Sequence, residues 1–163
     1  MYDKPLTIEQ NLSILAATPS RMSDLTKGLP AALLLTPPEA GEWSARDVLA
    51  HLRACSDMWG KSIVEILGQD QPTIKAVNPT TWIKQTNYLE QAFRTSLKAF
   101  RVQRAELLRV LQPLPPKAWS RTATVTGAGK PRQRTMQTYA QWLANHEQSQ
   151  MRQMERIVNT LLL

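Results

Sequence analysis

Cysteine and histidine are scarce in this sequence of 163 residues, which contains one cysteine, Cys55, and two histidines, His51 and His146. A single cysteine excludes an internal disulfide, a redox pair of cysteines and a cysteine-rich zinc ribbon. We therefore expect any metal site to use histidine, carboxylate or amide ligands. Cys55 follows His51 by one helical turn, but we interpret it as a core residue, because free cysteine usually packs as a small apolar side chain.

Long apolar runs are also missing. Stretches such as AALLL at residues 31–35 are far shorter than the roughly 20 residues that span a bilayer. The N-terminal sequence MYDKPLTIEQ has no basic region followed by an apolar stretch, so it does not resemble a secretory signal. With 42% apolar and 20% charged residues, the composition is typical of a globular protein. We expect a single cytoplasmic domain over residues 1–163, with no membrane partner.

Acidic residues are nearly absent from the segment 94–134. It holds ten Lys or Arg and one acid, Glu106, whereas the rest of the chain holds ten bases and twelve acids. The formal net charge of +7 therefore arises from this basic segment. Its simplest interpretation is a solvated basic face, although such a patch also attracts nucleic acid, an anionic metabolite or an acidic partner. Nucleic acid is the less favoured partner, because aromatic residues that stack on bases are scarce in the segment.

Helical periodicity dominates the sequence. Apolar residues recur at helical spacing in four regions, at residues 8–25, 44–66, 82–111 and 135–161. The second region has a sharp start, because Ser44 and Asp47 form the pattern of a capping box. The connections between these regions are rich in Pro and Gly, and residues 113–134 are compatible with a short hairpin or an ordered loop. Without a convincing set of strands, the sequence predicts an all-α fold, an antiparallel four-helix bundle with long connections.

Three polar side chains fall inside the apolar stripe of the last helical region. A helix advances about 100° per residue, so positions can be placed relative to Tyr139. On this construction His146, Gln150 and Gln153 face the core, whereas Glu147 points away from it. Burying unpaired polar groups costs roughly 1 to 3 kcal/mol each, so these groups need partners.

Two other helices carry polar residues near their apolar faces. His51 lies at the border of the stripe of the second region, from which its side chain can turn toward a neighbouring helix. Arg104 falls among the apolar positions of the third region, where a guanidinium requires an acceptor or a cavity open to water.

The sequence HEQSQ at residues 146–150 is similar to the zinc-binding HExxH motif but is not an example of it. Gln150 replaces the second histidine, and Glu147 is expected to point out of the core. A peptidase of the zincin type is therefore excluded. Two alternatives are left open, a metal site with other ligands and a buried pair of His146 and Gln150 that fixes the register of the helix.

Two stretches of the chain resemble a known family. They are GEWSARDVLAHLRACSDMW at residues 41–59 and AWSRTATVTGAGKPRQRTMQTYAQWLANHEQSQMRQMERI at residues 118–157. With their patterns WSxRDVLAHL and WLxxHExxxxRQxxRI, they resemble the DinB-like family of four-helix-bundle proteins, which is unrelated to the DNA polymerase of that name. The resemblance covers nearly the whole chain in order.

The resemblance implies a divalent metal, zinc, nickel or manganese, held in the bundle by three histidines. Carried over position by position, the ligands are His51, His146 and Gln150, so the third ligand is a neutral amide that binds more weakly than imidazole. With metal bound, Arg104 is expected to orient an anionic substrate. Gln153 is expected to hold the ligands in position without binding the metal itself.

Relatives in this family are described as metal-dependent hydrolases or thiol S-transferases. This implies Lewis-acid activation of a water or a thiolate at an open coordination position between the second and fourth helices. The resemblance also implies a homodimer. Because Gln150 departs from the family pattern, the alternative is a metal-free polar network in a module that binds a small molecule or a partner.

Overall fold

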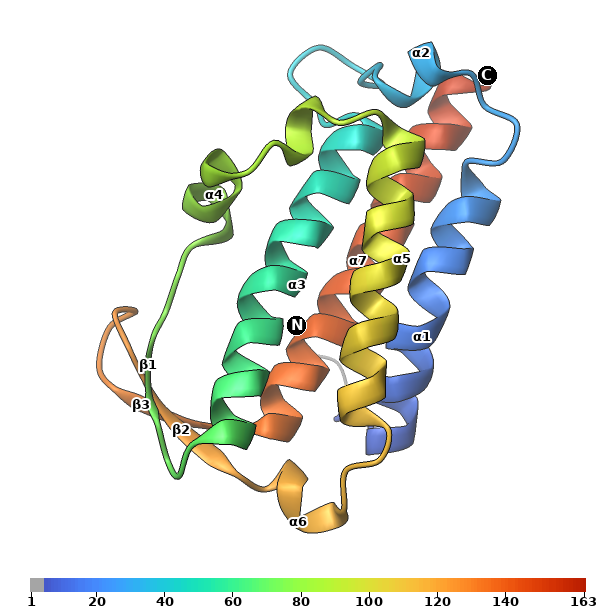
Figure 1. The fold of residues 1–163 in the computed structure, drawn as a ribbon. Helices are drawn as coiled ribbons and strands as arrows, with labels where there is room; N and C mark the ends of the chain where they lie inside the picture. Colours follow the sequence, from blue (N-terminus) through green and yellow to red (C-terminus); the bar gives the residue numbers. More distant parts are fainter. Residues whose placement is uncertain (1–4) are drawn as a thin grey trace.

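Four long helices make up most of the computed structural model, which describes residues 5–163 (Figure 1). They are α1 (Ile8–Leu25), α3 (Ala45–Gly68), α5 (Phe93–Leu111) and α7 (Met136–Leu161). The four-helix bundle expected from the sequence is thereby confirmed. Residues 1–4, which belong to the N-terminal stretch MYDKPLTIEQ considered above, lie outside the described residues. Within residues 5–163, no helix combines the length and the hydropathy needed to cross a membrane.

Each long helix packs against two others. α1 and α3 both contact α5 and α7, so α1 and α3 lie diagonally across the bundle. α1 and α7 run in one direction and α3 and α5 in the other (Figure 1). α3 and α7 are therefore antiparallel neighbours, and their central parts face each other.

The connections carry short elements of their own. They are α2 (Ala31–Leu34), β1 (Thr73–Lys75), α4 (Pro79–Trp82), η1 (Ile83–Gln85), η2 (Tyr88–Glu90), α6 (Pro116–Trp119), β2 (Thr122–Thr126) and β3 (Arg132–Thr135). The strands form a small sheet in the order β1-β2-β3, in which β1 is parallel and β3 antiparallel to β2. The hairpin that the sequence offered as one alternative for residues 113–134 is confirmed in β2 and β3.

The predicted start of the third helix was wrong. The spacing of apolar residues placed it at Trp82, but α5 begins at Phe93, and Trp82 belongs to the short helix α4. The reason is a set of hydrogen bonds to Asp57 on α3. The Nε1–H of Trp82 donates to Asp57 Oδ2 at 3.1 Å, and the hydroxyl of Tyr88 donates to the same oxygen at 2.6 Å. These contacts hold residues 79–90 across α3 instead of in line with α5.

A layer of polar side chains divides the core of the bundle. Two apolar clusters fill its two ends, with representative members Leu15, Ile63, Leu111 and Leu143 in one and Met22, Leu49, Phe100 and Met154 in the other. Between these clusters each long helix contributes one buried polar residue, and we call these four residues the polar layer: Thr18, Ser56, Arg104 and Glu147. Among the ligands expected from the sequence, His146 is adjacent to Glu147 of this layer, and His51 and Gln150 lie within about a turn and a half of it along their helices.

The start of α3 confirms the predicted capping box. The backbone N–H of Asp47 donates to Ser44 Oγ at 3.2 Å, and the backbone N–H of Ser44 donates to Asp47 Oδ2 at 2.9 Å. We expect Ser44→Ala to lower the free energy of unfolding by about 1 kcal/mol, since the first turn loses its acceptor. Urea denaturation would measure the change, with Ser149→Ala on the exposed face of α7 as a control that leaves stability unchanged. Equal stability of the Ser44 variant and the wild type would contradict a role for this cap.

Candidate metal centre

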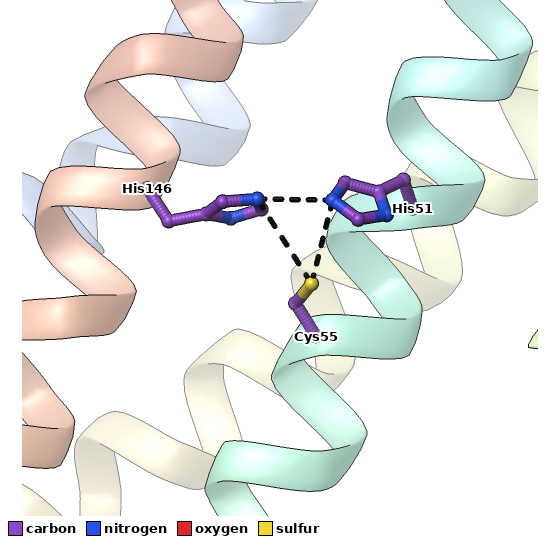
Figure 2. Close-up of side chains that lie close together, drawn as sticks. All are labelled: His51, Cys55 and His146. Carbon is purple, nitrogen blue, oxygen red and sulfur yellow. Dashed lines mark hydrogen bonds between the residues drawn. The ribbon is translucent and has the colours of Figure 1, made fainter. Parts of the chain in front are cut away.

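Three side chains with metal-binding atoms converge between α3 and α7 (Figure 2). His51 and Cys55 lie one turn apart on α3 and therefore share one face of that helix, and His146 reaches them from α7. The Nε2 atoms of the two histidines are 3.0 Å apart. Cys55 Sγ lies 3.6 Å from His51 Nε2 and 4.0 Å from His146 Nε2. The three ligand atoms thus form a compact triangle.

The dimensions of this triangle fit a tetrahedral zinc ion. With Zn–N bonds of about 2.0–2.1 Å and a Zn–S bond of about 2.3 Å, two ligand nitrogens lie about 3.3 Å apart, and nitrogen and sulfur about 3.6 Å apart. The observed 3.6 Å between Cys55 Sγ and His51 Nε2 equals the ideal value, and the other two separations, 3.0 and 4.0 Å, differ from theirs by a few tenths of an ångström. Small rotations of the three side chains are therefore enough to accommodate the ion.

The surroundings of the triangle favour neutral imidazoles. The ring of Trp43 packs against His51 with centroids 5.0 Å apart, and the ring of Trp59 meets His146 edge-on at 5.4 Å. Burial lowers the pKa of His51, and burial together with the nearby charge of His51 lowers the pKa of His146 to about 4. Both rings are therefore neutral at neutral pH, which is the form that coordinates metals.

The thiol of Cys55 is protonated in the absence of a metal. Burial, followed by the charge of Glu147, raises its pKa to about 12. Metal binding must then displace a proton from sulfur, as is general for cysteine ligands. An unassisted nucleophilic role is not supported, because a nucleophilic cysteine requires a lowered pKa.

Gln150 and Gln153 lie further along α7, one and two turns beyond His146, and both are half-buried. Gln150 Oε1 is buried without a hydrogen-bond partner among the described residues, and so is Nδ1 of His146. An amide oxygen that lacks a donor is available to a metal, a water molecule or a substrate. Gln150 therefore remains a candidate fourth ligand.

Glu147 does not point away from the core, so that prediction was wrong. It is fully buried, and so are Ala140, Ala144 and Met151 on the same side of α7. Because α7 packs against both α1 and α3, its buried arc is wider than a single apolar stripe, and Glu147 lies near the middle of that arc. His146 lies toward its edge instead, where it faces α3.

Arg104 has the acceptor that its buried position requires. Its guanidinium forms a two-point ion pair with the Glu147 carboxylate, one contact being Nη1 to Oε1 at 2.6 Å. It also donates to the carbonyl oxygen of Leu15 and to Ser56 Oγ, both at 2.9 Å, and Thr18 Oγ1 donates to Glu147 Oε1 at 2.7 Å. These contacts occupy both terminal nitrogens of Arg104 within the polar layer, so the structure gives no support to its expected role of orienting an anionic substrate.

Sequence reasoning missed Cys55 as a candidate ligand. Its position four residues after His51 was noticed, but its burial was attributed to ordinary core packing. The signal that could have identified it is the loss of the third histidine at Gln150, because a soft thiolate on the face of His51 can compensate for an amide.

Comparisons with known proteins agree with this fold. The family model described as the DinB superfamily matches residues 14–154. No curated protein matches the sequence significantly. Among solved structures, the chain is similar to YfiT from Bacillus subtilis, which is described as a probable metal-dependent hydrolase with an unusual four-helix bundle topology. The two share 16% sequence identity and a TM-score of 0.73, over 96% of this chain and 91% of that one. The resemblance noted in the sequence is confirmed, and the chain belongs to the DinB superfamily.

Proposed function

We propose that this protein binds one divalent metal ion through His51, Cys55 and His146 and acts as a metal-dependent hydrolase or thiol S-transferase. The observation that carries the proposal is the triangle of donor atoms, with separations of 3.0, 3.6 and 4.0 Å. Its donor set of two imidazoles and a thiolate favours zinc over manganese, because soft sulfur ligands select zinc. The description of YfiT as a probable metal-dependent hydrolase supports the same class of activity.

Three protein ligands are typical of a catalytic zinc site, since structural sites use four. A divalent ion held here supplies Lewis-acid activation of a water molecule or a thiol substrate at the remaining position. The two ligands on α3 and the one on α7 fix the geometry, while the rings of Trp43 and Trp59 pack against the two histidines. The unpaired Oε1 of Gln150 can accept a hydrogen bond from the activated group or complete the ligand set.

A metal-free binding module is the second candidate, and one contact favours it. The 3.0 Å separation of the two Nε2 atoms also fits a hydrogen bond, in which one neutral imidazole donates and the other accepts. In that case His51, Cys55 and His146 form a partly buried polar network that fixes α3 against α7, and the protein binds a small molecule without catalysing a reaction.

Metal analysis separates the two candidates. Tag-free protein is dialysed with zinc, nickel or manganese, and the retained metal is measured by elemental analysis. We expect about one equivalent of zinc per chain in the wild type and less than about a tenth of that in His146→Ala, because two remaining ligands hold zinc weakly. Ser149→Ala, an exposed position on the same helix, should retain the full equivalent.

Two results would contradict the proposal. One is a wild type that retains no metal under any of these conditions, and the other is a His146→Ala variant that retains as much metal as the wild type. With metal bound, hydrolysis of model esters and amides and conjugation of low-molecular-weight thiols are the reactions to compare. The proposal requires that either activity follow the metal content and disappear in His146→Ala.

A further inference from the structure

A cavity of about 380 Å³ lies beside the candidate metal centre, between α3, α7 and the small sheet. The chain from β1 to α4 runs along the outside of α3 and forms the outer wall (Figure 1). The volume of the cavity is within the range of roughly 300–1,000 Å³ that is common for small-molecule sites. None of the three candidate ligands lines the cavity, so it is distinct from the metal centre.

Four aromatic rings line this cavity. Trp59, Trp82, Tyr139 and Trp142 line it from α3, α4 and α7. Tyr139 and Trp142 meet edge to face with centroids 5.6 Å apart, and the bond from Trp82 Nε1 to Asp57 fixes a third ring. Rings held in this way give flat surfaces against which another flat, apolar molecule can stack.

Three cations and two carboxylates lie at or beside the cavity, which leaves an excess of one positive charge. Lys61 and Lys75 line it with exposed side chains, and the guanidinium of Arg134 lies 4.5 Å from the ring centre of Trp142. Of the two acids in the lining, Asp57 already accepts hydrogen bonds from Trp82, Tyr88 and Gln103. These donors are neutral and leave the carboxylate charged, so Asp57 and Glu65 together offset two of the three cations.

The cavity shares a wall with the metal centre. Trp59 lines the cavity and also packs edge-on against the ring of His146 at 5.4 Å. A molecule stacked on Trp59 therefore lies one ring away from a candidate ligand.

We propose that this cavity binds a small aromatic anion, with its ring among the tryptophans and its anionic group at Lys61 and Lys75. The aromatic residues in the walls account for the flat apolar part of the ligand, and the excess of cations over carboxylates beside the cavity accounts for its charge. This inference goes beyond the proposed function, because neither the stacking nor the charge preference requires a bound metal.

A matched pair of probes tests the proposal. 2-Naphthoate and its neutral amide, 2-naphthamide, have the same ring and differ in charge. Binding is followed by NMR through the indole N–H signal of Trp82 and by calorimetry, in protein treated with EDTA and in protein loaded with zinc. We expect 2-naphthoate to bind at least about fivefold more tightly than the amide, with an advantage that shrinks as salt is added.

Two kinds of variant locate the site. Ala76→Trp places a bulky side chain in the cavity and should abolish binding of both probes, whereas Ala105→Trp on the exposed face of α5 should not. The double variant Lys61→Gln, Lys75→Gln should remove the preference for the anion, whereas Lys84→Gln, Lys98→Gln, at exposed positions outside the lining, should keep it.

Equal affinity for the two probes in the wild type would overturn the proposed anion preference. An unchanged Trp82 signal, or full binding by Ala76→Trp, would overturn the site. Because the same titrations are made with and without zinc, binding in EDTA-treated protein supports the inference even where the metal proposal fails. Retention of zinc without binding of either probe contradicts the inference alone.

Discussion

Replacing Arg104 by methionine is expected to lower the free energy of unfolding by about 3–5 kcal/mol, because the Glu147 carboxylate would then be buried without its partner. Glu147 is fully buried and Arg104 is 2% exposed, so the carboxylate is shielded from bulk water. Three hydrogen bonds beyond the ion pair, those to Leu15, Ser56 and Thr18, also connect this pair to the bundle. Denaturation in urea, followed by circular dichroism, measures the change.

The matched control is an exposed ion pair on the same bundle. Arg21 and Glu155 are 3.9 Å apart and about half exposed, so Arg21→Met should cost less than about 1 kcal/mol. A double variant, Arg104→Met with Glu147→Leu, should recover most of the stability lost in the single variant, because no charge is then left buried. A loss in Arg104→Met no larger than in Arg21→Met would contradict a buried, mutually dependent pair.

The polar layer also bears on the metal centre. Ser56 follows Cys55 on α3, and Glu147 follows His146 on α7, so each of these candidate ligands is adjacent to a residue that Arg104 holds. A helix that is fixed at one residue cannot rotate at the next. The network therefore sets the directions in which Cys55 and His146 project. In this way residues that do not bind the metal hold the ligands in position.

Local patterns made the helices and their boundaries predictable where side chain and backbone act together. The capping box at Ser44 identified the first residue of α3, because the pattern corresponds directly to two hydrogen bonds near the helix start. The start of α5 was not predictable in this way. Trp82 has helical spacing relative to Phe93, but its position is decided by its hydrogen bond to Asp57, which is a contact between distant parts of the chain.

The candidate site was predictable only in part, for a related reason. The wheel that placed His146 in the core was centred on large apolar residues and gave no weight to Ala140 and Ala144. The true buried arc includes those alanines and has Glu147 near its middle. The direction of a helical face depends on which helices surround it, and a single sequence does not reveal that α7 packs against both α1 and α3.

The other large expected effect is on the affinity for zinc, and it depends on which residue is the third ligand. Cys55→Ala is expected to weaken zinc binding by more than about 100-fold. Even the loss of a group that only hydrogen-bonds to a ligand lowers metal affinity by about 10- to 100-fold. Gln150→Leu should weaken it by about tenfold or less, because a neutral amide contributes little beside a thiolate. Competition with a chromophoric chelator measures both affinities, with Ser149→Ala as the control on α7.

Cobalt substitution shows independently which atom binds the metal. A thiolate ligand gives cobalt(II) an intense sulfur-to-metal charge-transfer absorption in the near ultraviolet, which oxygen and nitrogen ligands do not give. This band should be present in the wild type and in Gln150→Leu and absent in Cys55→Ala, because Cys55 Sγ lies 3.6 and 4.0 Å from the Nε2 atoms of the two histidines. Two results together would contradict the thiolate ligand: a wild type without the band, and a larger loss of zinc affinity in Gln150→Leu than in Cys55→Ala. The third ligand would then be the amide of Gln150, and Cys55 would be a core residue.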